Sequence, residues 1–295
     1  MDKEIEEKYL KAGKIAAEAL KFGKELVKPG VLVVEVLDKI EAKILELGGE
    51  IAFPAQISLN ETAAHYCPLL GDETKFKDRL VKIDVGVHID GHIADTALTV
   101  DLSGKYSELV KASAEALDKA LSIIKPGLAI GEIGRVIHET ISGHGFSPIK
   151  NLSGHGLGEY DVHTKPTIPN FDTGDERILE EGMVFAVEPF ASTGKGVVYE
   201  SGEAGVFMLV AKRPVRSPIA REVLKEIETY QGLPFAKRWL QKKFGAKVGF
   251  AFRELNQFGC LKAFPPLVDE GKGMVSQAEH SVMVTKDGCK VCTRI

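Results

Sequence analysis

The sequence predicts a mixed α/β (α+β) fold with two pseudo-symmetric halves. Each half has two helices and an antiparallel hairpin, and the second half carries a helical insertion. The first observation is an internal repeat: two Lys-Pro-Gly triplets, at 28–30 and 125–127, stand 97 residues apart, and Val36 matches Ile133 at the same offset. The second is a hairpin signal within 81–100, where apolar residues flank an Asp-Gly dipeptide. The third is that acidic residues recur in apolar segments of both halves.

The helices are predicted from apolar residues that recur at helical spacing. The predicted helices of the two halves span 2–27, about 33–47, 106–124 and about 130–142. Lys-Pro-Gly ends the first and third, because proline lacks the N–H that a helix interior needs. The second ends at Gly48 and Gly49, as helices commonly do. An extended segment that carries His65 then leads to the hairpin.

The hairpin is expected to put two aspartates on one face. A two-residue loop pairs Ile89 with His92. Asp95 then lies opposite Gly86. Asp84 shares the face of Gly86, so Asp84 and Asp95 become diagonal neighbours roughly 7–8 Å apart. Two carboxylates on one face repel each other, and the apolar residues around them indicate burial. A metal between them is therefore favoured over a solvated acidic face.

The repeat predicts a second acidic pair, and the sequence supplies one. Glu188 in MVFAVEPF stands where the first half has Asp84. Glu279 in SQAEHSVMV stands where it has Asp95. About 90 residues separate the second pair, so residues from about 200 to 270 are interpreted as an insertion into the second hairpin. The insertion is expected to contain helices near 217–230, 234–244 and 250–258.

Acids on the inward faces of two facing hairpins are expected to meet in one interior cavity. Four buried negative charges need compensation, and two divalent cations would balance them in number. A carboxylate-rich site suits Mn, Fe(II) or Co, with Zn as a further option. His155, which stands between glycines, and His163 are the candidate nitrogen ligands.

Composition indicates an ordinary globular protein. The chain has 295 residues, 44% of them hydrophobic, and its net charge of −4 gives no support for a nucleic-acid-binding protein. The basic residues of the insertion are interpreted as a solvated face. No apolar run is long enough to span a membrane, and the charged N-terminus argues against a secretory signal, so a cytoplasmic protein is expected. Cys289 and Cys292 form a C-x-x-C without a second pair and are interpreted as incidental thiols.

Five short motifs follow one another along the chain. They are SLNETAAHY, KIDVGVHIDGHIADTALTV, NLSGH followed by His163, AVEPF and SQAEHS. Together they strongly resemble the motifs of type II methionine aminopeptidases, and the short N-terminus resembles the archaeal form. The resemblance covers essentially the whole chain. It implies a single catalytic domain over 1–295 with the pita-bread fold, which is a duplicated α/β unit, and a type II helical insertion at about 200–270.

The resemblance also implies which residues hold the metals. The implied ligands are Asp84, Asp95, His155, Glu188 and Glu279. Asp95 and Glu279 would bridge two divalent ions. Asp84 would complete the shell of one ion, and His155 with Glu188 would complete the shell of the other.

The catalytic and substrate-binding residues are implied in the same way. The catalytic residues would be His65, His163 and Glu188, with both histidines contacting the substrate near the scissile bond. A slot for the methionine side chain would be formed by Phe53, Val162, Phe190 and Phe264. Phe264 stands where the family often has tyrosine, which implies a slot of different polarity. Lys165 stands where relatives commonly have glycine shortly after the second histidine, which bears on the shape of that loop but on no ligand.

The implied activity is hydrolysis of the first peptide bond of nascent polypeptides, which releases methionine and favours small second residues. Two divalent ions per subunit (Co, Mn, Fe(II) or Zn) are the implied cofactors. The expected partners are the nascent chain and, transiently, the ribosome; the protein is expected to be a monomer, without a membrane or a specific nucleic acid. One alternative is a prolidase or Xaa-Pro aminopeptidase of the same fold, although those usually carry a large N-terminal domain. A catalytically dead binding scaffold is another, and such proteins lose metal ligands.

Overall fold

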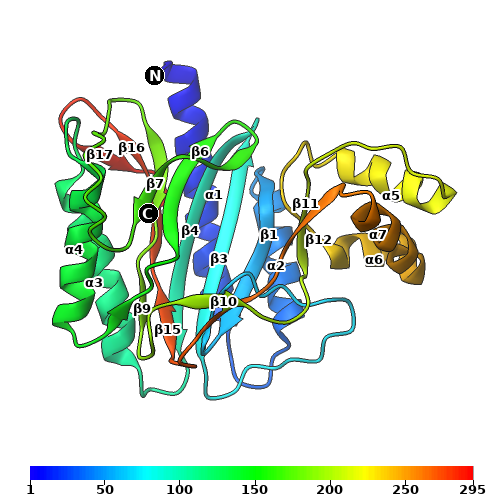
Figure 1. The fold of residues 1–295 in the computed structure, drawn as a ribbon, viewed down its shortest axis with the longest axis horizontal. Helices are drawn as coiled ribbons and strands as arrows, with labels where there is room; N and C mark the ends of the chain where they lie inside the picture. The colour runs from blue at the N-terminus through cyan, green and yellow to red at the C-terminus, as the bar shows by residue number, and fades with distance from the viewer. Residues whose placement is uncertain (295) are drawn as a thin grey trace.

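A computed structural model describes residues 1–294, and its centre is one antiparallel sheet of eight strands (Figure 1). Seven strands follow the order β1-β3-β4-β16-β8-β6-β7, and β17 pairs with β16. Their bounds are β1 Glu50–Leu59, β3 Leu80–Ile89, β4 His92–Asp101, β16 Glu279–Val284, β8 Val184–Val187, β6 Ser153–Gly158, β7 Asp161–Pro169 and β17 Cys289–Val291. First-half strands thus meet second-half strands where β4 pairs with β16.

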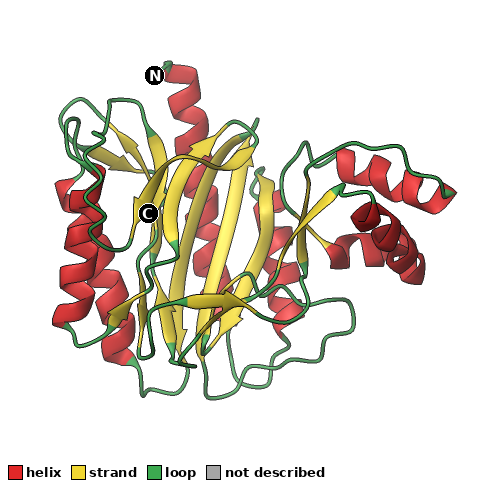
Figure 2. Ribbon diagram, viewed as in Figure 1, coloured by secondary structure: helices red, strands yellow, loops and turns green. Residues whose placement is uncertain are grey.

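Two helix pairs pack on the sheet (Figure 2). The first pair is α1, Lys3–Leu26, and α2, Val33–Glu46; the second is α3, Ser107–Ile123, and α4, Ile130–Gly143. Every one of these helices ends within one residue of the predicted bounds, so the amphipathic pattern is confirmed. The first pair shares a core with β1 and β3, and the second shares a core with strands of the second half.

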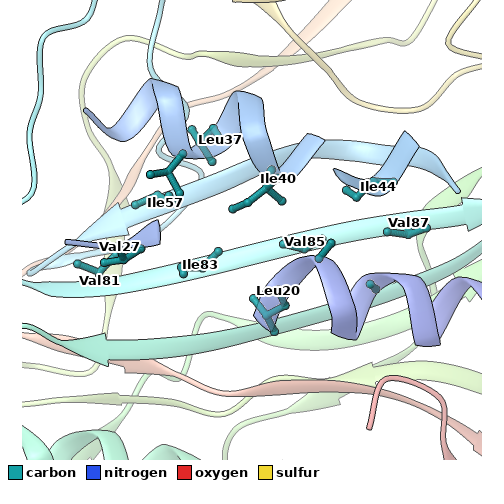
Figure 3. Close-up of a cluster of buried hydrophobic side chains, with 14 of the residues drawn as sticks. Leu20, Val27, Leu37, Ile40, Ile44, Ile57, Val81, Ile83, Val85 and Val87 are labelled. Carbon is teal, nitrogen blue, oxygen red and sulfur yellow. The ribbon is translucent and has the colours of Figure 1, made fainter. Parts of the chain in front are cut away.

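Alternation along β3 separates apolar from acidic side chains. The odd-numbered side chains Val81, Ile83, Val85 and Val87 are fully buried against Leu20 and Val27 on and just after α1, and Leu37, Ile40 and Ile44 of α2 (Figure 3). Successive residues of a strand point to opposite faces, so Asp84 faces away from the helices. The helices therefore cover one face of the sheet and leave the other for the acids.

The hairpin register is the predicted one. The strands β3 and β4 pair Gly86 with Asp95 and Asp84 with Ala97. On the other side of β4, Ala97 also pairs with Glu279 of β16. Directly paired residues share a face, so Asp84 and Glu279 flank Ala97 from the two halves of the molecule. The two halves thus join at their acidic residues.

The predicted helices of 200–270 are present and form a lobe beyond β1 and α2 (Figure 1). They are α5 Pro218–Glu228, α6 Lys237–Phe244 and α7 Val248–Gln257, with a 3-10 turn at Gly245–Lys247. A three-stranded sheet in the order β12-β11-β13 connects the lobe to the rest of the chain. Its strands are β11 Val206–Leu209, β12 Phe235–Ala236 and β13 Leu261–Phe264. The lobe has a hydrophobic core of its own.

Two further small sheets were not predicted. Their orders are β10-β14-β2 and β15-β9-β5. The strands are β2 Thr62–Ala64, β5 Ser147–Pro148, β9 Phe190–Ser192, β10 Val198–Glu200, β14 Leu267–Asp269 and β15 Val275–Gln277. Segments this short cannot display an alternating pattern, so the sequence gives no signal for them.

The thiol of Cys289 donates to the carbonyl oxygen of Leu121, and that of Cys292 to the carbonyl oxygen of Lys290. Both thiols of the C-x-x-C are therefore directed at backbone. Over residues 1–294, the helices lack the combination of length and apolarity that crossing a membrane would require.

Gly86 provides a test of how tightly the acidic face is packed. A Cβ added there would lie 2.1 Å from the Cε1 atom of Phe53, because the Phe53 ring covers the glycine. We expect Gly86→Ala to destabilise the protein by about 1–3 kcal/mol, measured by urea unfolding. The control is Gly249→Ala on α7, where no atom lies within 4 Å and stability should be unchanged or slightly higher. Equal stabilities of the two variants would contradict this packing.

Candidate metal centre

One cavity of about 330 Å³ receives side chains from both halves of the chain. The predicted metal ligands all line it: Asp84 from β3, Asp95 from β4, His155 from β6, Glu188 directly after β8 and Glu279 at the start of β16. Three of the four acids are therefore held by a hydrogen-bonded sheet, and the fourth follows one of its strands. The sheet thus presents oxygen and nitrogen donors to one cavity.

The ligand atoms lie at distances that suit shared coordination. The Nε2 atom of His155 is 3.7 Å from Asp95 Oδ2 and 3.7 Å from Glu188 Oε1. One ligand atom each of Asp95, His155 and Glu279 all lie within 4.8 Å of one another. Donors that share one ion sit roughly 2.0–2.2 Å from it, so two donors can be about 4 Å apart. The separations fit a divalent ion between these side chains.

Charge gives an independent reason for a cation here. The oxygens Asp84 Oδ1, Asp95 Oδ1 and Glu279 Oε1 are buried and have no hydrogen-bond partner within residues 1–294. Burial raises the pKa of Asp84 to about 7. Burial, reinforced by the neighbouring carboxylates, raises the pKa values of Asp95, Glu188 and Glu279 well above their usual range. Protons or metal ions must therefore compensate the negative charge of the four carboxylates, and this set of oxygen and nitrogen donors fits divalent metals.

Three histidines meet in the same cavity. Their rings form a chain of contacts: the centroids of His155 and His163 are 4.4 Å apart, and Phe264 lies 6.4 Å from His163 and 5.7 Å from His65. Burial lowers the pKa of His155 to about 3 and that of His65 to about 4. Both are neutral at pH 7, so His155 can offer a lone pair to a metal. His65 has a left-handed backbone with φ of 66°, which is uncommon for a non-glycine residue and often marks a functional site.

The apolar side of the cavity contains all four predicted residues of the methionine slot. These are Phe53, Val162, Phe190 and Phe264. Val206 and Pro234, from the segment around the helical lobe, also line the cavity and were not predicted. They escaped prediction because nothing in the sequence indicates that this segment returns to the acids.

Two polar residues that support the acids were also missed. The Nε2 atom of Gln277 donates to Glu279 Oε2 at 3.3 Å. The hydroxyl of Ser281 accepts from the Asp95 N–H at 2.7 Å and donates to the Asp95 carbonyl oxygen at 2.8 Å. A signal was available for Ser281, because it stands two positions after Glu279 in β16 and strand alternation puts it on the same face. Gln277 ends β15, a separate strand of another sheet, so alternation gives no such signal for it.

Comparison with known proteins agrees with this geometry. The profile of metallopeptidase family M24 matches residues 7–214. A methionine aminopeptidase of Archaeoglobus fulgidus is 47% identical over 296 aligned positions that cover 100% of both chains. The crystal structure of methionine aminopeptidase from Rickettsia prowazekii superposes with a TM-score of 0.74 at 25% identity, covering 100% of this chain and 98% of that one.

A prolidase from Pyrococcus furiosus shares the fold at a TM-score of 0.64 and 21% identity, and this chain covers 65% of it. The family profile spans most of the chain, and the archaeal relative spans all of it. The mixed α/β architecture is therefore the predicted pita-bread fold, and the chain belongs to metallopeptidase family M24.

Proposed function

We propose that this chain is a methionine aminopeptidase, a hydrolase that uses divalent metal to remove the N-terminal methionine of nascent polypeptides. The observation that carries the proposal is the cavity, where carboxylate and imidazole side chains from both halves lie beside apolar ones. Full-length relatives named methionine aminopeptidase support the same activity. The predicted ligands Asp84, Asp95, His155, Glu188 and Glu279 would hold two divalent ions.

Each group has a task in this reaction. Bound divalent ions would supply Lewis acidity toward the scissile carbonyl and activate water near neutral pH. The raised pKa of Glu188 lets its carboxylate hold and release a proton beside the scissile bond. His65 is neutral at pH 7 and can donate an N–H to the developing oxyanion or the leaving nitrogen, as can His163. The slot of Phe53, Val162, Phe190 and Phe264 would bind the methionine thioether by apolar and sulfur–aromatic contact.

We propose further properties on the strength of the family resemblance. Small second residues would be preferred in the substrate. The protein would act as a monomer and associate transiently with the ribosome. Residues from about 200 to 270 would be an insertion in a single catalytic domain over 1–295, which the separate core of the helical lobe supports.

The function is tested with two peptides and a series of metals. After removal of metals, the protein should release no methionine from a Met-Ala peptide, and addition of Mn²⁺, Fe²⁺, Co²⁺ or Zn²⁺ one at a time should restore release. An Ala-Pro peptide distinguishes the prolidase alternative. Cleavage of Ala-Pro in preference to Met-Ala would overturn the proposal. A protein that binds no divalent ion after reconstitution would instead favour a binding scaffold.

Stability of the metal-free protein should fall as pH rises. Asp84 has a pKa of about 7 in the folded protein and about 4 unfolded, so the folded state holds a proton that the unfolded state loses across this window. Raising the pH from about 4 to about 7 therefore favours unfolding, by on the order of 4 kcal/mol for this group alone. Calorimetry should show a smaller fall in Tm for Asp84→Asn, and added Mn²⁺ should raise wild-type Tm more at pH 7.5 than at pH 5. Parallel pH profiles of the two metal-free proteins would contradict the charge assignment.

His163 should affect turnover without affecting metal binding. We expect His163→Ala to retain wild-type metal content, measured by elemental analysis, and to lose about 10²–10³-fold in kcat on Met-Ala, because a hydrogen-bond donor to the transition state is removed. His138→Ala on α4 is the matched control, since His138 does not line the cavity, and it should keep wild-type turnover. Turnover of His163→Ala within twofold of wild type would refute the role.

A further inference from the structure

Arg238 is a buried cation that the proposed chemistry does not use. Its side chain, on the first turn of α6, has no exposed surface. The guanidinium donates to Cys67 Sγ at 2.7 Å and to the carboxylate of Glu41, and its Nε lies 3.5 Å from Asp38 Oδ1. The indole N–H of Trp239 donates to the other oxygen of Glu41 at 2.9 Å.

This network joins three segments that are far apart in the sequence. Arg238 belongs to the helical lobe, Glu41 belongs to α2 of the first half, and Cys67 follows His65 by two residues. Figure 1 shows the lobe beyond β1 and α2, on the side of the sheet away from α3 and α4. A buried ion pair is often no more stabilising than apolar side chains of similar volume, so stability alone does not explain it. A planar guanidinium does, however, fix the relative geometry of the groups that it contacts.

A short path leads from Arg238 to the cavity. The strand β12 ends at Ala236, two residues before Arg238. Ala236 pairs with Val206 of β11, and Val206 pairs on its other side with Phe264 of β13. Val206, Phe264 and Pro234, which directly precedes β12, all line the cavity. The start of α6 is therefore connected to the cavity wall through the paired residues Ala236, Val206 and Phe264 of this small sheet.

The same wall contacts the loop that carries His65. A Cβ added at Gly205 would lie 1.8 Å from the carbonyl oxygen of Cys67, so the two backbones touch directly. The carbonyl oxygen of Gly205 accepts from the N–H of Lys237 at 2.9 Å. The ring of Phe264 meets that of His65 edge to face at 5.7 Å. The position of His65 relative to Phe264 thus depends on how this junction is held.

We propose that Arg238 is a positioning residue for substrate recognition. It holds the wall formed by Val206, Pro234 and Phe264 at a fixed distance from His65 through Glu41 and Cys67. This inference rests on the proposed function, because the wall closes the slot assigned to the methionine side chain. Loss of Arg238 should loosen the slot and leave the metal ligands in place, since the ligands come from the large sheet and the loop after β8.

The test removes the ion pair without leaving a buried charge. Arg238→Met alone would strand the Glu41 carboxylate, so it is combined with Glu41→Gln, which keeps an acceptor for Trp239. We expect the double variant to fold and to bind wild-type amounts of Mn²⁺. On Met-Ala its KM should rise about tenfold with kcat within about threefold, and its preference for Met-Ala over Leu-Ala should fall by a similar factor. Arg238→Lys keeps the charge but loses the planar guanidinium. Its KM on Met-Ala should lie between those of the wild type and the double variant.

Lys242→Met is the matched control on the same helix. It breaks an exposed pair with Asp38, 2.6 Å long, and leaves Arg238, Glu41 and Cys67 intact, so its kinetics should be those of wild type. A folded double variant with wild-type KM and wild-type preference for Met-Ala would overturn the proposal.

Should the double variant not fold, Cys67→Ala replaces it, because it removes the link between Arg238 and the His65 loop at a side chain that also packs against Val206 and Ala236 of the wall. A raised KM then supports the proposal and a wild-type KM overturns it. Failure of the wild-type protein to release methionine is a separate result, which would count against the proposed function.

Discussion

Four carboxylates sharing one buried cavity is the constraint on which the rest of the structure depends. Their loss of hydration and mutual repulsion oppose folding unless cations or protons are present, and both effects raise the pKa values of Asp95 and Glu279. Loops would let such groups move apart, whereas sheet strands hold them through backbone hydrogen bonds. Because Asp84 and Glu279 come from different halves and flank Ala97, the site exists only when both halves are folded and joined. Metal binding and folding are therefore coupled in this architecture.

The junction between the halves is short, and side chains reinforce it. Only two residue pairs connect β4 and β16 in the sheet. Beside them, the hydroxyl of Thr96 donates to the carbonyl oxygen of Glu279 at 2.9 Å, and Ser281 makes two hydrogen bonds to the backbone of Asp95. Further along, Thr99 and Gln277 exchange hydrogen bonds at 2.7 and 2.8 Å. Side-chain hydroxyl groups thus add hydrogen bonds to the two backbone pairs between β4 and β16. These bonds lie next to the acids, where fixed distances matter most for binding a metal.

The sequence predicted those parts of the fold that local patterns encode. An Asp-Gly turn and alternation predict the β3–β4 register, and the repeat predicts that Glu188 and Glu279 join the first-half acids, which line the same cavity. The strands of two or three residues were not predictable, because they form only when distant segments supply partners. The pair of Arg238 with Glu41 spans 197 positions, and no periodic signal links α6 to α2.

The cavity also separates two requirements that many sites must satisfy with the same residues. Metal binding needs charge and fixed distances, and the proposed ligands lie on strands of the central sheet and on the loop after β8. The proposed slot for a methionine side chain needs an apolar wall of the right shape, and part of the cavity's apolar lining comes from the segments around a lobe with its own hydrophobic core. Changes in that lobe can therefore alter the slot without disturbing the charge balance at the acids. A wall that can change independently of the acids is useful only if its distance from His65 stays fixed. The buried guanidinium of Arg238 contacts the lobe, α2 and the His65 loop, and it fixes this distance through its planar geometry more than through net stability.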